Sequence, residues 1–299
     1  MAKTTYNTLL QLVENVKIEG DARTLLTQMR WRGVPTCPHC KCTKIYSLSD
    51  KKSYLCKDCN KQFTVTKGTI FENSNVPLRK WLIALFLAIS NKKGITSIQL
   101  SKQIGVTQKT AWFMLQRLRR LFEDQEPGLL DETIEVDETY VGGRHRGKRG
   151  RGSENKTPVF GMVQRKGRII AKVVPNTQRV TLEPIINRFV VKGSEIMSDE
   201  WWAYRKLGEN YVHQFVNHGR KQYADGLVHT NTIEGFWGYF KRGIRGVYQY
   251  VSRKHMQKYV DEFTFRYNTR KWSINEAFLH TLQCTERRLS YQALTQGIS

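Results

Sequence analysis

The residues whose chemistry is clearest are four cysteines in two close pairs. Cys37 and Cys40 form one C-x-x-C pair, and Cys56 and Cys59 form a second pair after fifteen intervening residues. Each pair makes a tight turn that directs two sulfurs at one point, and two such turns complete the shell of a four-thiolate zinc site. Because four thiolates leave no open position for water, the spacing predicts a structural Zn²⁺ ion, not a catalytic one.

Two neighbouring residues are rival ligands, and unligated thiols are the alternative to any metal. His39 lies inside the first pair, and Cys42 lies just beyond it, in a poor position to reach the same ion. The stretch 36–71 has few apolar side chains, so metal binding would supply the free energy that its small core lacks. The isolated Cys284 is expected to be a small buried hydrophobic residue.

The second candidate for chemistry is an α/β region with acidic residues at strand positions. Strand patterns cover 134–141, 158–164, 168–174, 194–198 and 213–216, and helical patterns cover 181–191 and the residues after Thr230. This order predicts a ribonuclease-H-like mixed sheet flanked by helices. Such a layout places a carboxylate in the first strand beside another after the fourth strand. A third metal-binding group comes from a later helix.

Carboxylates in this arrangement suit phosphoryl transfer. Two Mg²⁺ ions about 4 Å apart can clamp the attacking and leaving oxygens of a phosphodiester. Hard divalent ions prefer oxygen ligands, and Mg²⁺ keeps several waters, so a few carboxylates suffice. The α/β region is therefore expected to bind two catalytic Mg²⁺ ions, for which Mn²⁺ can substitute.

Three helices are expected in residues 76–122, and they fit a helix-turn-helix. A capping box at Thr96 begins the second helix, and Gly105 stands where the turn needs a positive φ. In such a motif the first turn of the third helix enters the major groove. The residues of that turn are Gln108, Lys109 and Thr110. The alternative is a three-helix packing module that does not contact DNA.

Composition indicates a folded protein with a polyanionic partner. The 299 residues include 49 Lys and Arg against 26 Asp and Glu, a net charge of +23, and 39% are hydrophobic, which excludes a disordered chain. The longest apolar run, 81–89, is too short to span a bilayer, and no signal sequence is seen. We therefore expect double-stranded DNA as partner, no membrane contact, and a cytoplasmic, nucleoid-associated location. A basic loop expected to follow the DNA backbone contains Arg144, Arg146, Lys148, Arg149 and Arg151.

Several segments taken together resemble a known family. The sequence resembles bacterial insertion-sequence transposases of the DDE class, and more closely the group with an N-terminal zinc ribbon, insertion-sequence family fifteen-ninety-five. The resemblance extends from about Trp31 to Arg270. The segments that carry it are Cys37–Cys59, Val136–Gly143, Ser198–Asp199, His229–Trp237 and Lys241–Gly246.

The resemblance implies roles for particular residues. Asp137 and Asp199 would bind the catalytic metals, and Glu234, 35 positions after Asp199, is favoured as the third ligand. Many family members have Asn in the third place, so Asn231 stays open, and a capping box would explain both Asn231 and Glu234 structurally. Lys241, two helical turns beyond Glu234, would hold the transposon end. Arg242 beside it is also expected to contact DNA.

The activity that the resemblance implies is transposition. The protein would bind terminal inverted repeats, cleave 3′ strands by two-metal hydrolysis, and join the 3′-hydroxyls to target DNA as a homodimer or larger synaptic assembly. The alternatives are a zinc-ribbon regulator with an inactive catalytic fold, a nuclease or resolvase that never joins ends, and a DNA-packaging protein. Several aromatic residues could stack on an unpaired base at the cleaved end. They are Trp201, Trp202, Tyr204, Trp237, Tyr239, Tyr248 and Tyr250.

The predicted organisation has five parts. They are an N-terminal helical segment at 1–35, a zinc ribbon at 36–71, a helix-turn-helix-like region at 72–125, a catalytic domain at 130–285 and a tail at 286–299.

Overall fold

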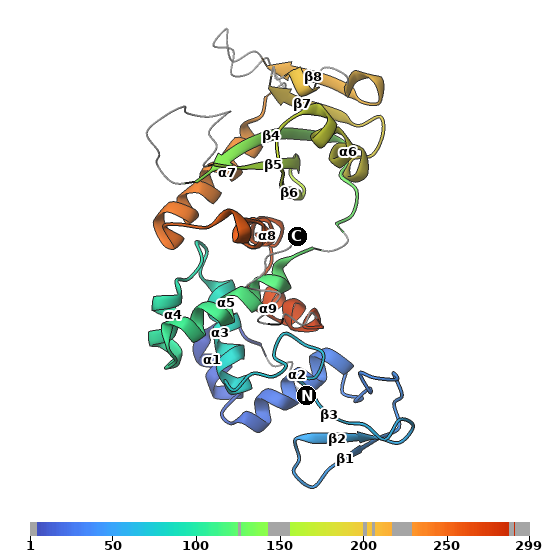
Figure 1. Cartoon of the computed structure of the whole chain (residues 1–299), viewed down its shortest axis with the longest axis vertical. Helices are drawn as coiled ribbons and strands as arrows, with labels where there is room; N and C mark the ends of the chain where they lie inside the picture. The colour runs from blue at the N-terminus through green and yellow to red at the C-terminus, as the bar shows by residue number, and fades with distance from the viewer. Residues whose placement is uncertain are drawn as a thin grey trace. The chain divides into compact units, whose positions relative to one another are not determined.

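The computed structural model divides the chain into two compact units (Figure 1). Unit 1 comprises residues 1–122 and 271–299, and unit 2 comprises residues 123–270. The residues that the structure describes are 5–124, 127–142, 156–199, 202–204, 207–216, 229–286 and 290. The predicted DNA-contacting residues Arg144, Arg146, Lys148, Arg149 and Arg151 lie outside the described residues.

Unit 1 combines a helical core with a small three-stranded sheet. Its helices are α1 (Leu9–Asn15), α2 (Glu19–Trp31), α3 (Leu78–Ser90), α4 (Ser97–Ile104), α5 (Gln108–Phe122) and α9 (Ile274–Gln283). Its strands β1 (Ile45–Ser47), β2 (Ser53–Cys56) and β3 (Gln62–Thr64) pair antiparallel in the order β1-β2-β3. α3 is apolar around most of its surface because it is the central helix of the unit, with Trp81 and Leu82 fully buried.

Helix α9 belongs to unit 1, whereas the sequence placed it in a catalytic domain ending at 285. The reason is the apolar face of α9. The fully buried ring of Phe278 lies 5.6 Å from the ring of Tyr6 and 5.8 Å from that of Phe86, both in edge-on contacts. The carbonyl of Thr285 also accepts a hydrogen bond from the amide of Ile70.

Unit 2 is a five-stranded mixed sheet with helices on both faces. The strands are β4 (Thr133–Val141), β5 (Thr157–Gln164), β6 (Ile169–Val173), β7 (Glu195–Asp199) and β8 (Val212–Val216), in the order β6-β5-β4-β7-β8. β4, β5 and β6 pair antiparallel, while β7 and β8 run parallel to β4. The remaining elements are α6 (Arg179–Phe189), η1 (Trp202–Tyr204), η2 (Leu207–Glu209), α7 (Asn231–Gly243), η4 (Ile244–Tyr248), η5 (Arg253–His255) and α8 (Met256–Asn268). The three-strand meander followed by two parallel strands is the ribonuclease-H-like layout that the sequence predicted.

Alternation along the strands assigns each residue to one face of this sheet. Ile134 and Val136 pack in the core beneath α6, whereas Val141 packs in the core beneath α7 and α8. Because successive side chains in a strand point to opposite faces, Asp137 lies on the face that α7 covers. Ile196 of β7 belongs to the α6 side, so Asp199, three residues on, lies on the α7 side as well.

No helix among the described residues is both long enough and apolar enough to cross a bilayer.

Candidate active site and metal centre

The four paired cysteines form a compact sulfur cluster in unit 1. Their ligand atoms all lie within 4.8 Å of one another, with 3.7 Å between the sulfurs of Cys37 and Cys59 and 3.5 Å between those of Cys40 and Cys56. A tetrahedral Zn²⁺ ion with bonds of about 2.3 Å requires sulfurs about 3.8 Å apart. The donor set therefore fits zinc. Cys42 does not belong to the cluster, and its sulfur accepts a hydrogen bond from the amide of Lys44.

The two cysteine turns are built alike. The amide of Lys41 bonds to the carbonyl of Cys37, and the amide of Asn60 bonds to that of Cys56, so each turn closes one residue after its second cysteine. Lys41 and Asn60 both take positive φ, at 64° and 51°. The amide of Cys59 is the main cause that lowers the pKa of the Cys56 thiol to about 6, a shift toward the thiolate that metals bind.

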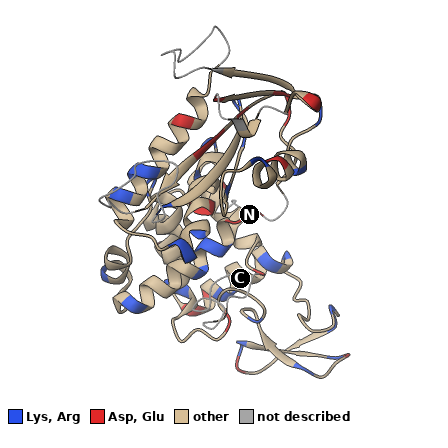
Figure 2. Cartoon of the chain, turned by 45° about the horizontal axis from the view of Figure 1, so that its top comes forward, with Lys and Arg blue, Asp and Glu red and all other residues tan. Residues whose placement is uncertain are grey.

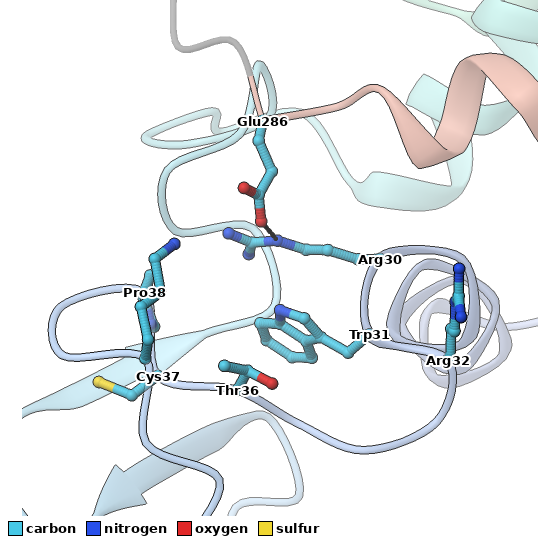
Figure 3. Close-up of a pocket in the computed structure, with 8 residues that line it drawn as sticks. Arg30, Trp31, Arg32, Thr36, Cys37, Pro38 and Glu286 are labelled. Atoms are coloured by element: carbon cyan, nitrogen blue, oxygen red, sulfur yellow. Dashed lines mark hydrogen bonds and ion pairs between the residues drawn. The ribbon is translucent and has the colours of Figure 1, made fainter.

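A cavity of about 270 Å³ adjoins the cysteine cluster (Figure 3). Figure 3 shows Arg30 between the ring of Trp31 and the carboxylate of Glu286. The side chain of Arg30 is only 3% exposed, its guanidinium lies 4.7 Å from the Trp31 ring, and it pairs with Glu286 at 2.9 Å. Glu286 neutralises the charge of Arg30. Through this ion pair and the contact with Trp31, Arg30 links the segment after α9 to the ribbon.

In unit 2 the strand register brings together the two predicted aspartates. β4 and β7 pair in parallel through Glu135 and Met197, and two residues further along each strand stand Asp137 and Asp199. Neighbouring strands lie about 4.8 Å apart, and both residues share the α7 face. Unit 2 thus places side by side two carboxylates that are 62 positions apart in sequence.

Helix α7 is fixed over these aspartates by Glu135, which is fully buried on the same strand face. Its carboxylate accepts the amides of Thr232 at 2.8 Å and Ile233 at 3.0 Å, so it caps the first turn of α7. Arg165 balances its charge at 2.8 Å. Because Glu135 provides the cap, the capping-box explanation of Asn231 and Glu234 is not what the structure shows.

The middle of α7 is held to the sheet by Trp237. Its indole N–H donates to Oδ2 of Asp137 at 3.1 Å. The ring lies over Gly161, which is the direct neighbour of Asp137 on β5. A Cβ atom at Gly161 would lie 2.6 Å from Cζ2 of Trp237, so only glycine leaves room for the indole.

Gly161→Ala is therefore expected to displace Trp237 and to break its bond to Asp137. The loss of stability should be about 1–3 kcal/mol, typical of an overpacked core, and activity that depends on Asp137 should fall. Urea unfolding and a strand-joining assay would measure both effects. Gly235→Ala is the matched control, since its Cβ meets nothing within 4 Å and alanine favours the helix. Equal stability in both variants would contradict the packing argument.

Acidic neighbours accumulate around Asp137. Burial, together with the negative charges of Glu138, Asp199 and, less strongly, Glu234, raises the pKa of Asp137 to about 8. Lys241 faces the same group, because the charge of Asp137 acts on its pKa, which burial lowers. Glu234, Lys241 and the two aspartates therefore share one electrostatic environment. Figure 2 shows acidic segments on the strands of the large sheet and both acidic and basic segments on the neighbouring helices.

This raised pKa predicts how the stability of the metal-free protein varies with pH. Asp137 stays protonated in the folded chain up to about pH 8, whereas an ordinary Asp ionises near 3.8. The folded state therefore binds the extra proton between these values, and stability must decrease as pH rises through this range. Asp137→Asn should remove that contribution. Urea unfolding at pH 5 and pH 8 measures it, and identical pH slopes for both proteins would contradict the raised pKa.

The third-ligand candidates both lie in the first turn of α7. Asn231 and Glu234 are exposed, and Glu234 accepts a hydrogen bond from the hydroxyl of Thr230 at 3.0 Å. Of these two candidates, Glu234 is the one whose charge contributes to the raised pKa of Asp137. Among the described residues, the cysteine cluster alone has three or more ligand atoms within 4.8 Å of one another. The carboxylates of unit 2 therefore share a face of the sheet, but no three of them have oxygen atoms that close together.

Two of the aromatic residues expected to stack on DNA bases are instead buried in unit 2. Tyr204 is 1% exposed, and its hydroxyl donates to Glu138 at 2.6 Å. Trp237 is 4% exposed and bonded to Asp137. Tyr250 is 72% exposed. Trp201 lies outside the described residues.

In unit 1 the predicted helix-turn-helix residues are on the surface. Gly105 ends α4 with φ of 62°, and α5 begins three residues later. Gln108 and Lys109 are exposed and Thr110 is half-buried. The Gln108 amide donates to the hydroxyl of Ser97 at 2.8 Å, which ties the start of α5 to α4.

Comparisons with known proteins agree with both units. Residues 129–268 match the ISXO2-like transposase domain, and residues 17–62 match the transposase zinc-ribbon domain. An "uncharacterized protein in transposable element ISH50" of Halobacterium salinarum is 31% identical over 271 residues, covering 83% of this chain and 90% of the relative. An "uncharacterized transposase-like protein" of Haemophilus influenzae is 30% identical over 104 residues, covering 34% of this chain and 83% of its own length.

Solved structures give a looser comparison. The structural alignment with the Mos1 strand transfer complex covers 70% of this chain and 79% of the Mos1 chain, at 12% sequence identity and a TM-score of 0.29. The Mos1 paired-end complex overlaps 70% and 80% at 12% identity, with a TM-score of 0.27. The fold assignment therefore rests on the strand order and on the family match.

A zinc-ribbon module and a ribonuclease-H-like sheet carrying neighbouring aspartates define a DDE-type DNA transposase. The chain belongs to the insertion-sequence family fifteen-ninety-five (IS1595).

Proposed function

We propose that this protein moves its own insertion sequence by cutting the 3′ strands at the element's ends and joining the freed 3′-hydroxyls to target DNA. The register that sets Asp137 beside Asp199 on the face covered by α7 is the observation that carries this proposal. Glu234 is the third acid, because its charge acts on Asp137.

The acids have a defined task in this reaction. Asp137, Asp199 and Glu234 would hold divalent cations, which we propose to be two Mg²⁺ ions with Mn²⁺ as a substitute. Bound there, the ions supply Lewis-acid stabilisation to the attacking and leaving oxygens of a phosphodiester. The donor set fits such ions, because the negative charges of Asp199 and Glu234 raise the pKa of Asp137, and bound cations would relieve that repulsion.

Other residues position the substrate and the acids. Trp237 directs one oxygen of Asp137 toward α7. Lys241, within the field of Asp137, would neutralise a phosphate of the transposon end. Arg242, exposed beside it, would contact the same backbone.

Recognition of the ends is proposed for unit 1. The exposed first turn of α5, with Gln108, Lys109 and Thr110, would enter the major groove, and the zinc ribbon would hold a second contact. The net charge of +23 provides the general attraction to DNA. Two ends must meet before they are joined, so we propose a homodimer or a larger assembly.

Strand joining is the test. A labelled duplex with a pre-cut 3′ end from the element's terminal repeat is incubated with plasmid and Mg²⁺ or Mn²⁺, and covalent joining is measured on a denaturing gel. We expect metal-dependent joined product. Nicking without joining would indicate a nuclease or resolvase, and binding without either reaction would indicate a regulator.

A further inference from the structure

A small basic pocket lies at the C-terminal end of α7 and is separate from the acids. Its volume is about 60 Å³, and it is bounded by the end of β4, the start of β5 and the turn that follows α7. Three cations line it, namely Lys156, Lys241 and Arg245. None of the described residues that line it is acidic.

The three cations lack partners within the part of the chain that the structure describes. No hydrogen bond or ion pair joins the side chain of Lys156, Lys241 or Arg245 to a described residue. Arg245 and Lys156 lie close enough to Lys241 for their charges to act on it. Arg30 in unit 1 is different, because Glu286 neutralises it. Like charges that converge without a counterion are expected at a site for an anionic ligand.

The rim of the pocket offers a flat surface for a nucleoside. Tyr250 lines the pocket, and 72% of it is exposed. The preceding residue, Gln249, has φ of 60°, so the chain turns sharply before Tyr250. An exposed aromatic ring next to cations is the combination with which proteins hold a sugar-phosphate backbone and stack one base.

We propose that this pocket binds the phosphate of a nucleotide next to the cleaved bond, with Lys156 and Arg245 as its ligands beside Lys241 and with Tyr250 against the adjoining base or sugar. Lys241 connects the pocket to the acids, since Asp137 acts on its charge. The inference rests on the proposed function, because it assigns the phosphate to the DNA strand that the acids cut.

The experiment combines protein and DNA changes. Lys156→Ala and Arg245→Ala are compared with Lys192→Ala and Arg253→Ala, exposed cations of unit 2 that do not line the pocket. Each protein is assayed for joining with end duplexes in which one phosphate at a time near the cleaved bond is replaced by a neutral methylphosphonate. Salt dependence of binding to a random duplex is measured alongside.

We expect one methylphosphonate position to lower wild-type joining about tenfold and to have no further effect on Arg245→Ala, because the same contact is already lost. Each pocket variant should reduce the salt slope by about 0.9, the value for one phosphate contact. Tyr250→Ala should lower joining without changing that slope, and Tyr250→Phe should restore joining.

Three results would overturn the assignment. In the first, the pocket variants behave like the two control variants. In the second, the effects of Arg245→Ala and of every methylphosphonate are independent. In the third, inorganic phosphate inhibits joining by the wild type as strongly as a competitor duplex that lacks the element's cleavable end. The pocket would then be a site for free inorganic anions. A wild type that never joins ends would instead refute the proposed function, so the two failures are distinguishable.

Discussion

Asp137→Ala and Asp199→Ala are each expected to abolish strand cleavage and joining while DNA binding persists. The two carboxylates lie side by side on the neighbouring strands β4 and β7, so each variant removes one of the carboxylate ligands of the cation site. Loss of metal stabilisation of several kcal/mol corresponds to a rate decrease of about three orders of magnitude or more. DNA binding should remain, because it depends on basic residues outside this pair.

The measurement is the joining assay together with a gel-shift titration on the same duplex. Glu209→Ala is a suitable control, since Glu209 is an exposed carboxylate of unit 2 on η2. Asp137→Asn adds a second check, because it keeps the acceptor for Trp237 but removes the charge. Joining that persists in either aspartate variant would refute the assignment of these residues as metal ligands.

Removal of zinc is expected to unfold the zinc ribbon. The ribbon has only a small core, in which Cys37, Cys56 and Phe63 are its buried members. Structural zinc sites contribute about 10–16 kcal/mol of apparent binding free energy, far more than this core provides. Cys56→Ser, at a fully buried position, should therefore lose the ion and the protection of β1, β2 and β3 from hydrogen exchange.

Zinc content by mass spectrometry and amide exchange would measure both effects. Cys42→Ser and Cys284→Ser are the matched controls, because neither sulfur belongs to the cluster, and both should retain one zinc per chain. Zinc retained by Cys56→Ser, or lost from Cys42→Ser, would show that the ligand set is different.

Local pattern was enough to predict the elements and the zinc cluster. Strand and helix patterns depend on neighbours in sequence, and the positions of β4 to β8 and of α3 to α5 follow them closely. The cysteine pairs are also local, since each turn closes within five residues. The positive φ of Asn60 suits its residue type, because asparagine tolerates the left-handed region, whereas the positive φ of Lys41 has no such signal.

Contacts between residues that are distant in the sequence could not be predicted from local pattern. The sequence gives no sign that Glu135 caps a helix 97 positions away, or that Gly161 is small to admit Trp237. Glu135 pairs with Arg165 as well as capping α7. Tyr204 was expected to stack on bases and is buried against Glu138.

The sequence by itself therefore determined the order of the elements, the cysteine cluster and, through family resemblance, the acids to examine. The tertiary structure decided that α9 packs with unit 1 and that Glu135 and Trp237 hold α7 over Asp137. It also decided that three cations whose side chains have no partner among the described residues share a pocket. The physical reason is range. Backbone conformation and metal turns depend on residues a few positions apart, whereas a cap, a packed indole or a charge cluster exists only after distant segments meet.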